Sequence, residues 1–366
     1  MPLSYENHQA LGSTPPWVWQ EAFADLHPSA DPLSLGDDED HDDEQTYRQF
    51  MNMGRRPPNE RGTGRWKITS TRKTIGIIAL DEGVSRRHLE GIRLYMSAFF
   101  HGFLVEVVEE LDTDVTLCTQ EERSFLRHGT NIFQIEQCTI DETVHVEVFS
   151  LFDALVSLAK PHHYCLMGLT SKPLAEEWTT TEDGNKDIQH TERMTVLGRA
   201  CGDRVCAVHV SCFGDERTRT TTTMTTLLAT CCHEVLHCMG VDHCTTFRCL
   251  MNAQSTENED CLFLSPLNLK KYVMGVMGIR DSSSSSHGDQ CMEFVLERYR
   301  RIRIALRTLG YDSSNFSCQW LDEKIKLLQK TPTRKNSKKP TKNNKRKLIR
   351  IIRGKQRSGI STGLPG

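Results

Sequence analysis

The chain has 366 residues, of which 37% are hydrophobic, and its 45 basic and 48 acidic residues give a net charge of −3. This length and apolar content are enough for a buried core, so they exclude a chain that is disordered throughout. No stretch reaches the roughly 18 apolar residues of a membrane helix, and Met1–Gln20 lacks the basic and apolar segments of a secretory signal. We therefore expect a soluble cytoplasmic protein without a membrane partner, with the nucleus as an alternative location.

The two ends of the chain differ in charge. An acidic cluster runs from Asp37 to Glu44, and because such polar sequence cannot bury enough apolar surface to fold, we predict a disordered acidic region over residues 1–66. Lys and Arg without acidic residues dominate 334–357, and we predict a basic disordered tail over residues 326–366. This tail is a candidate for nucleic-acid binding or for a nuclear address, with a solvated extension as the alternative.

Between these ends, residues 67–325 alternate between strand and helix patterns. The serines of 281–289 predict a flexible insertion. The alternation predicts an α/β fold with a mixed sheet followed by a helical part. The predicted elements are, in order, a strand Thr74–Leu80, a helix Leu89–Phe99, a strand Phe103–Val108, a helix Phe149–Leu158, strands Tyr164–Leu169, Met194–Arg199 and Val205–Val210, a helix from Thr221, and a helix Met292–Leu309.

The predicted helix from Thr221 contains the pattern H-E-x-x-H. Positions four apart on a helix differ by about 40°, so His233 and His237 project from one face and can bind one metal ion. Glu234 is close enough to hydrogen-bond a metal-bound water without being a ligand. Thr230 and Thr226 lie on the same face one and two turns earlier, and their small side chains leave room for a cleft.

Gly240 and His243 make this pattern more specific. If the helix continued, His243 would point about 80° away from the direction of His233. Glycine tolerates the left-handed conformation at a helix end, so Gly240 is placed to turn the chain and deliver His243 as a third ligand. Three neutral imidazoles with one open position are typical of a catalytic zinc. We predict one such zinc on His233, His237 and His243, and the alternative is that these histidines only pack.

The run from His233 to His243 resembles the metzincin signature H-E-x-x-H-x-x-G-x-x-H, which is followed by a later Met. Its continuation, with Cys244, Cys249 and Met251, is similar to archaemetzincins. The resemblance implies a metzincin-like mixed sheet with an active-site helix and a C-terminal helical subdomain. It also implies that Met251 is the Met-turn residue beneath the metal, and that the strand near Thr195–Arg199 forms the rim along which an extended peptide pairs.

One departure concerns a second zinc site. Archaemetzincins continue with a C-P-x-C element that completes a four-cysteine site, whereas Ser265 and Asn268 occupy the cysteine positions here. A hydroxyl and an amide are poor zinc ligands. We therefore expect a second zinc to be absent, with Cys244 and Cys249 left as buried thiols unless Cys261 substitutes for one ligand.

Together these residues predict a zinc metallopeptidase that hydrolyses peptides or proteins. Glu234 is the predicted general base, which takes a proton from water and passes it to the leaving amine. Cleavage by an aminopeptidase or by an endopeptidase remains open. The alternatives are a catalytically inactive zinc-binding module, against which the presence of Glu234 speaks, and a nucleic-acid-associated factor that acts through the basic tail.

Overall fold

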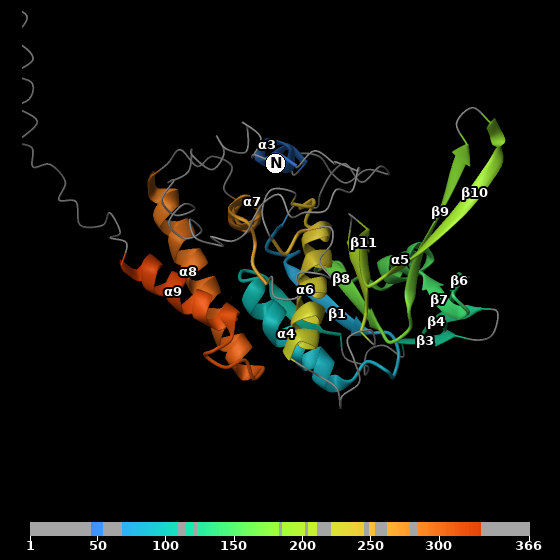
Figure 1. Cartoon of the computed structure of the whole chain (residues 1–366), viewed down its shortest axis with the longest axis horizontal. Coiled ribbons are helices and arrows are strands. Elements are labelled where there is room, and N and C mark those ends of the chain that lie inside the picture. The colour runs from blue at the N-terminus through green and yellow to red at the C-terminus, as the bar shows by residue number, and fades with distance from the viewer. Residues whose placement is uncertain are drawn as a thin grey trace, which may run out of the picture. The chain divides into compact units, whose positions relative to one another are not determined.

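The protein has a mixed α/β fold, as predicted (Figure 1). Its compact unit ends at Gln329. Among the helices that the structure describes, none is long and apolar enough to cross a membrane. The computed structural model describes residues 45–53, 68–108, 115–119, 123–182, 185–201, 204–210, 221–244, 249–252, 262–278 and 285–330.

A five-stranded sheet lies at the centre of this unit, with the strand order β11-β12-β8-β1-β2. Strands β12, β8, β1 and β2 are parallel, and β11 is antiparallel to β12. Strand β11 is therefore an edge strand of this sheet. The bounds are β1 Thr74–Ala79, β2 Leu104–Val107, β8 His163–Thr170, β11 Gly198–Cys201 and β12 Val205–His209.

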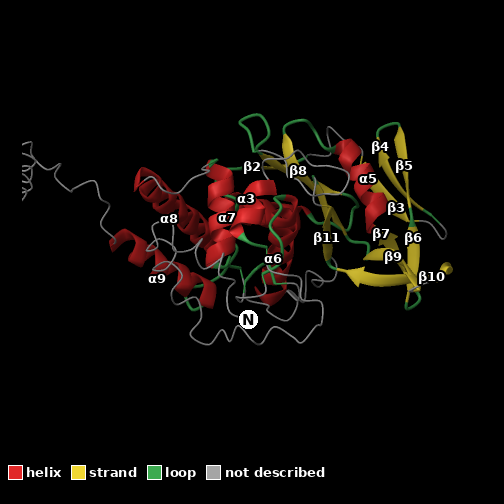
Figure 2. Ribbon diagram, turned by 90° about the horizontal axis from the view of Figure 1, so that it is seen from above, coloured by secondary structure: helices red, strands yellow, loops and turns green. Residues whose placement is uncertain are grey.

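Helices cover both faces of the central sheet. Alternate residues of β8 divide between two core clusters: Met167 packs in the cluster that contains α4 (Arg86–Phe99) and α6 (Thr221–Cys238), and Leu166 packs in the cluster of α5 (Val148–Leu158). Figure 2 shows α6 and α5 on opposite sides of β8. Because both faces are buried, the parallel strands read as continuous apolar runs in the sequence.

Two smaller sheets flank α5 and were not predicted. One is antiparallel, with the order β3-β4-β5, and the other has the order β10-β9-β7-β6. The predicted strand Met194–Arg199 is divided: its first residues end β10, and the rest begins β11 in the central sheet. The bounds are β3 Val115–Thr119, β4 Ser124–His128, β5 Asn131–Ile135, β6 Gln137–Ile140, β7 Thr143–Glu147, β9 Leu174–Glu182 and β10 Asn185–Val196.

Three helices form the C-terminal part: α7 (Pro266–Met277), α8 (Ser285–Thr308) and α9 (Phe316–Lys330). The expected flexible insertion at 281–289 is wrong from residue 285, where α8 begins, and 281–284 lie outside the described residues. The expected start of the disordered tail at 326 is also too early. Helix α9 continues to Lys330 because its apolar face is buried, and the rest of the basic tail lies outside the described residues.

The expectation of disorder through residue 66 fails for residues 45–53. Helix α3 (Tyr47–Met53) lies here, and its Phe50 is only 1% exposed. Burial of this ring in the main core, on the side of α7, orders a helix that is too short to be stable alone. The acidic cluster and the remainder of 1–66 lie outside the described residues.

Candidate metal centre

Helix α6 ends where the sequence predicts. Its last residue is Cys238, and Gly240 follows with a φ of 77°, in the left-handed region. The N–H of Gly240 donates to the carbonyl of His237, and the N–H of Val241 donates to the carbonyl of Leu236. These two bonds form a Schellman motif, which ends the helix and lets the chain turn back.

This turn brings three imidazoles together. The Nε2 atom of His237 lies 2.9 Å from Nε2 of His233 and 3.1 Å from Nε2 of His243. All three ligand atoms fall within 4.8 Å of one another. Zinc bound by imidazole needs nitrogens about 2.0–2.1 Å from one point, and nitrogens this close together reach such a point with small side-chain movements. The donor set therefore fits one zinc ion.

Backbone carbonyls orient two of these rings. Nδ1 of His233 lies 2.8 Å from the carbonyl oxygen of Leu250, which can only accept, so Nδ1 carries the proton and Nε2 keeps its lone pair. His237 makes a backbone hydrogen bond to Val241. A metal-binding histidine usually donates its second ring nitrogen in this way. Sequence reasoning missed Leu250 because its contribution comes from the main chain.

Burial keeps the first two imidazoles neutral. It lowers the pKa of His233 to about 4, and the neighbouring His243 acts in the same direction. Burial, followed by the charges of His233 and His243, also holds the pKa of His237 well below its usual range. Neutral imidazole is the form that binds a metal ion, so these rings need lose no proton at neutral pH.

Glu234 lies beside the first histidine of the site and is 6% exposed. Burial raises the pKa of its carboxyl to about 8; the Cys238 thiol contributes to the rise and the positive charge of Arg199 opposes it. Arg199 lies on edge strand β11 and also pairs with Glu176 at 2.9 Å. The carboxyl is thus more basic than an exposed one and lies close to the sheet edge.

Strand β11 packs closely on this face of α6. A Cβ atom at Gly198 would lie 2.9 Å from Cγ of Glu234 and 3.0 Å from Cγ2 of Thr230. The small side chain of Thr230 therefore leaves room for β11. This strand occupies the space that we predicted for a cleft. Gly198 was not singled out in the sequence, although a single glycine inside the predicted strand Met194–Arg199 is the kind of signal that indicates a bulge or a close approach.

Replacing Gly198 by Ala should impair hydrolysis without releasing zinc. The added methyl would lie closer to Glu234 than Cβ contacts allow, so either the strand or the carboxyl must shift. We expect peptide hydrolysis to fall roughly tenfold or more, because a displaced base meets its proton poorly. Gly91→Ala is the control, since its Cβ would make an ordinary 3.4 Å contact with Leu309. Parent-level activity in the Gly198 variant would contradict this account.

The loop that follows the third histidine is held by its own hydrogen bonds. The N–H of Cys249 donates to Oδ1 of Asn252 at 2.7 Å, and the amide of Asn252 donates to the carbonyl of Cys244. The N–H of Cys244 donates to the carbonyl of Met251 at 2.7 Å. Met251, the predicted Met-turn residue, is fully buried in the main core cluster. These bonds connect Cys244 to the segment Cys249–Asn252.

The residues at the position of the archaemetzincin second zinc site do not form a four-thiolate donor set. Sγ of Cys249 accepts hydrogen bonds from the N–H of Ser265 at 3.0 Å and from Nδ2 of Asn268 at 3.8 Å. Oγ of Ser265 in turn caps α7 by accepting the N–H of Asn268. Burial raises the pKa of the Cys249 thiol, but hydrogen bonds from Cys244, Met251 and Ser265 outweigh it and lower the pKa. Two thiols, a hydroxyl and an amide do not fit a structural zinc, and Cys261 lies outside the described residues.

We accordingly expect about one tightly bound zinc per chain, because an incomplete donor set does not hold a second ion. Elemental analysis of the purified protein measures this count. Cys249→Ser should leave it unchanged, and the double change Ser265→Cys and Asn268→Cys should raise it toward two. Two zinc ions in the parent, with one lost in Cys249→Ser, would show that other ligands complete the site.

A second group of possible metal ligands comes from β2 and from the start of β8. Nε2 of His162 and Nε2 of His163 each lie 2.9 Å from Oε1 of Glu106. The N–H of Lys160 donates to Nδ1 of His163 at 3.1 Å, so the proton of that ring is on Nε2 and is donated to Glu106. A metal at Nε2 would require the opposite tautomer. The geometry therefore indicates a hydrogen-bonded group.

No protein-family model matches the chain, and no curated protein matches it. Among solved structures, the crystal structure of archaemetzincin from Methanopyrus kandleri is similar to it with 15% sequence identity and a TM-score of 0.36. The match covers 58% of this chain and 99% of that chain. These values do not assign the chain to a family.

Proposed function

We propose that this chain is a zinc-dependent metallopeptidase of the archaemetzincin type, acting on peptides or proteins. The observation that carries the proposal is the convergence of Nε2 atoms of His233, His237 and His243 to 2.9 and 3.1 Å, with Glu234 buried beside them. Three imidazoles leave one position open on zinc, whereas structural zinc sites are closed by four ligands. A buried carboxyl costs free energy, and a purely structural zinc would not need one here.

The metal and the protein would contribute different parts of the hydrolysis. Zinc bound by the three imidazoles would polarise the scissile carbonyl and lower the pKa of a water molecule. Glu234 is buried next to His233 and would, as a carboxylate, take the proton of the attacking water. The same carboxyl would then give this proton to the leaving amine. Glu234 thus first accepts and later donates the proton that is transferred in the reaction.

The substrate is an extended peptide that pairs with β11. This strand is at the edge of the central sheet, hydrogen-bonded to β12 on one side. An edge strand offers backbone N–H and C=O groups to an added strand. Gly198 of β11 packs against Glu234, so a peptide along this edge would run beside the general base. We propose β11 as the substrate rim, which is expected near Thr195–Arg199 from the sequence.

Cleavage of a mixed peptide library by the zinc-loaded protein tests this function. We expect cleavage that stops when a chelator removes the metal and returns when zinc is added back. The ends of the products distinguish an aminopeptidase from an endopeptidase. A protein that binds zinc but cleaves none of the peptides would instead be an inactive zinc-binding module. Nucleic-acid binding that is lost on deletion of residues 334–366 would support a role for the basic tail.

A further inference from the structure

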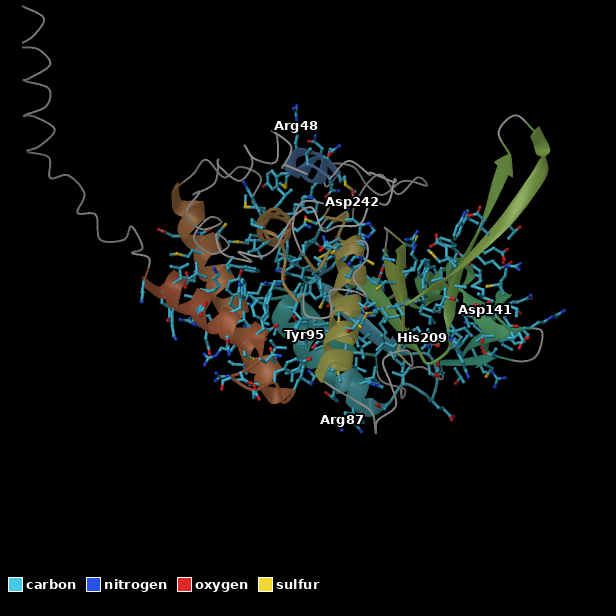
Figure 3. All side chains as sticks on the ribbon, viewed as in Figure 1. Arg48, Arg87, Tyr95, Asp141, His209 and Asp242 are labelled. Atoms are coloured by element: carbon cyan, nitrogen blue, oxygen red, sulfur yellow. The ribbon has the colours of Figure 1, made fainter. Side chains whose placement is uncertain are left out.

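The segment Gln45–Met53 contacts the turn that delivers His243. Gln45 is 4% exposed, and its Nε2 donates to the carbonyl oxygen of Gly240 at 3.0 Å. These two residues are 195 positions apart in the sequence. Gly240 has the left-handed conformation that ends α6, and Figure 3 labels Asp242, two residues further on, below helix α3. An amide from the N-terminal segment therefore holds the main chain between the second and the third imidazole.

Buried contacts with α7 fix this segment. Nζ of Lys271 donates to the carbonyl oxygen of Gln45 at 2.8 Å, and Nζ of Lys270 lies 4.6 Å from the ring centroid of Tyr47. Both lysines are fully buried, and the ring of Phe50 packs in the main core cluster. Burying an ammonium group is costly unless polar or aromatic partners compensate it. The segment is therefore an integral part of the packing around α7.

We propose that Gln45 is a positioning residue of the metal centre. Gly240 is buried just after the end of α6, and a buried main-chain carbonyl needs a hydrogen-bond donor. Gln45 supplies that donor to Gly240 and so holds His243 close to His233 and His237. Loss of the amide would leave a buried acceptor without its donor, and the turn would sample conformations that carry His243 away. The inference rests on the proposed zinc site.

The test replaces Gln45 by Met in the full-length protein. Met keeps the length and most of the volume of the side chain but has no N–H to donate. We expect the Kd for zinc to rise about threefold to tenfold, since one hydrogen bond behind a ligand is lost. The visible absorption spectrum of the cobalt-substituted protein should also change, because it reports the number and geometry of the ligands. A purely structural role for Gln45 would leave that spectrum unaltered.

Two matched controls separate positioning from a general loss of stability. Arg48→Ala changes an exposed residue of α3, in the same segment as Gln45, and its side chain points away from the body in Figure 3. Ile135→Val weakens the other core cluster, which does not contain the site, and should cost stability of a similar size. Both controls should retain the parent Kd and the parent cobalt spectrum. An unchanged Kd and spectrum in Gln45→Met would overturn the proposal.

Hydrogen exchange on the metal-free protein provides a readout that needs no zinc. The amides of Gly240 and Val241 donate within the turn, so their protection should fall roughly fivefold or more in Gln45→Met. If the parent bound no zinc, the proposed function would fail, but equal protection in parent and variant would still overturn the role of Gln45. If the Met variant did not fold, the same measurements would be made on Gln45→Asn. Its side chain is one methylene shorter, so its amide would lie further from the carbonyl of Gly240.

Discussion

Replacing Glu234 by Gln should abolish nearly all peptide hydrolysis while leaving zinc in place. Gln keeps the shape of the side chain, so its packing against Gly198 is preserved, but an amide cannot accept the proton of the attacking water. Loss of a general base costs about 10²–10⁴ in rate, which corresponds to about 3–5 kcal/mol in activation free energy. The measurement is kcat/KM on a cleaved peptide, with zinc content determined on the same preparations.

Glu176→Gln is the matched control for this prediction. It removes a carboxylate on β9 that pairs with Arg199 at 2.9 Å, near the same sheet edge but outside the group of imidazoles. We expect this variant to keep most of the parent activity. If Glu234→Gln cleaved peptides at the parent rate with unchanged zinc, Glu234 would not be the base and the proposed mechanism would be wrong.

His243→Ala should behave differently, because it removes a predicted ligand and leaves the base in place. Two imidazoles from α6 remain, and a catalytic zinc needs three protein ligands to be held tightly. We expect the Kd for zinc to rise by more than about 100-fold, since even changes behind a ligand cost tenfold to 100-fold. Competition with a chelator of known affinity measures this change, and hydrolysis should fall in proportion to the zinc that is lost.

His128→Ala provides the comparison for the third ligand. His128 lies on β4 in the three-stranded sheet, away from α6, so this variant should bind zinc like the parent. Added imidazole should restore part of the zinc binding of His243→Ala, because the free base can occupy the vacated position. Unchanged zinc affinity in His243→Ala would mean that the Gly240 turn does not deliver a ligand.

The central sheet and its helices were predictable because burial determines their pattern. Parallel strands such as β1 and β8 are covered on both faces and read as apolar runs, and α4 and α6 carry apolar stripes at helical spacing. The two smaller sheets were not predictable in this way. Strands such as β5 are short and mostly exposed, so burial imposes no clear pattern on them, and Ile132 of β5 is 61% exposed.

Helix α3 shows why the N-terminal boundary was misplaced. Its sequence, YRQFMNM, is short and lies within a polar region, so composition indicates disorder. The helix and the preceding Gln45 are held by partners far along the chain: Lys270 of α7 contacts Tyr47, and Lys271 donates to the carbonyl of Gln45. Tertiary packing of this kind overrides local propensity and leaves no local signal.

The same distinction between local and long-range features applies to the candidate site. The spacing of His233, His237 and Gly240 predicted the convergence of the imidazoles, because helix geometry and a glycine turn are local properties. The groups that support it were not predictable. Leu250 contributes a main-chain carbonyl, and Gln45 lies 195 positions from Gly240 in the sequence, so neither follows from a local pattern of side chains.

The central claim is that one zinc ion binds where the three imidazoles meet. Anomalous X-ray diffraction at the zinc absorption edge, on crystals of the zinc-loaded protein, locates the ion directly. We predict one strong peak within about 2.0–2.1 Å of the Nε2 atoms of His233, His237 and His243. A strong peak beside Cys244 and Cys249, with none among the three imidazoles, would contradict the account.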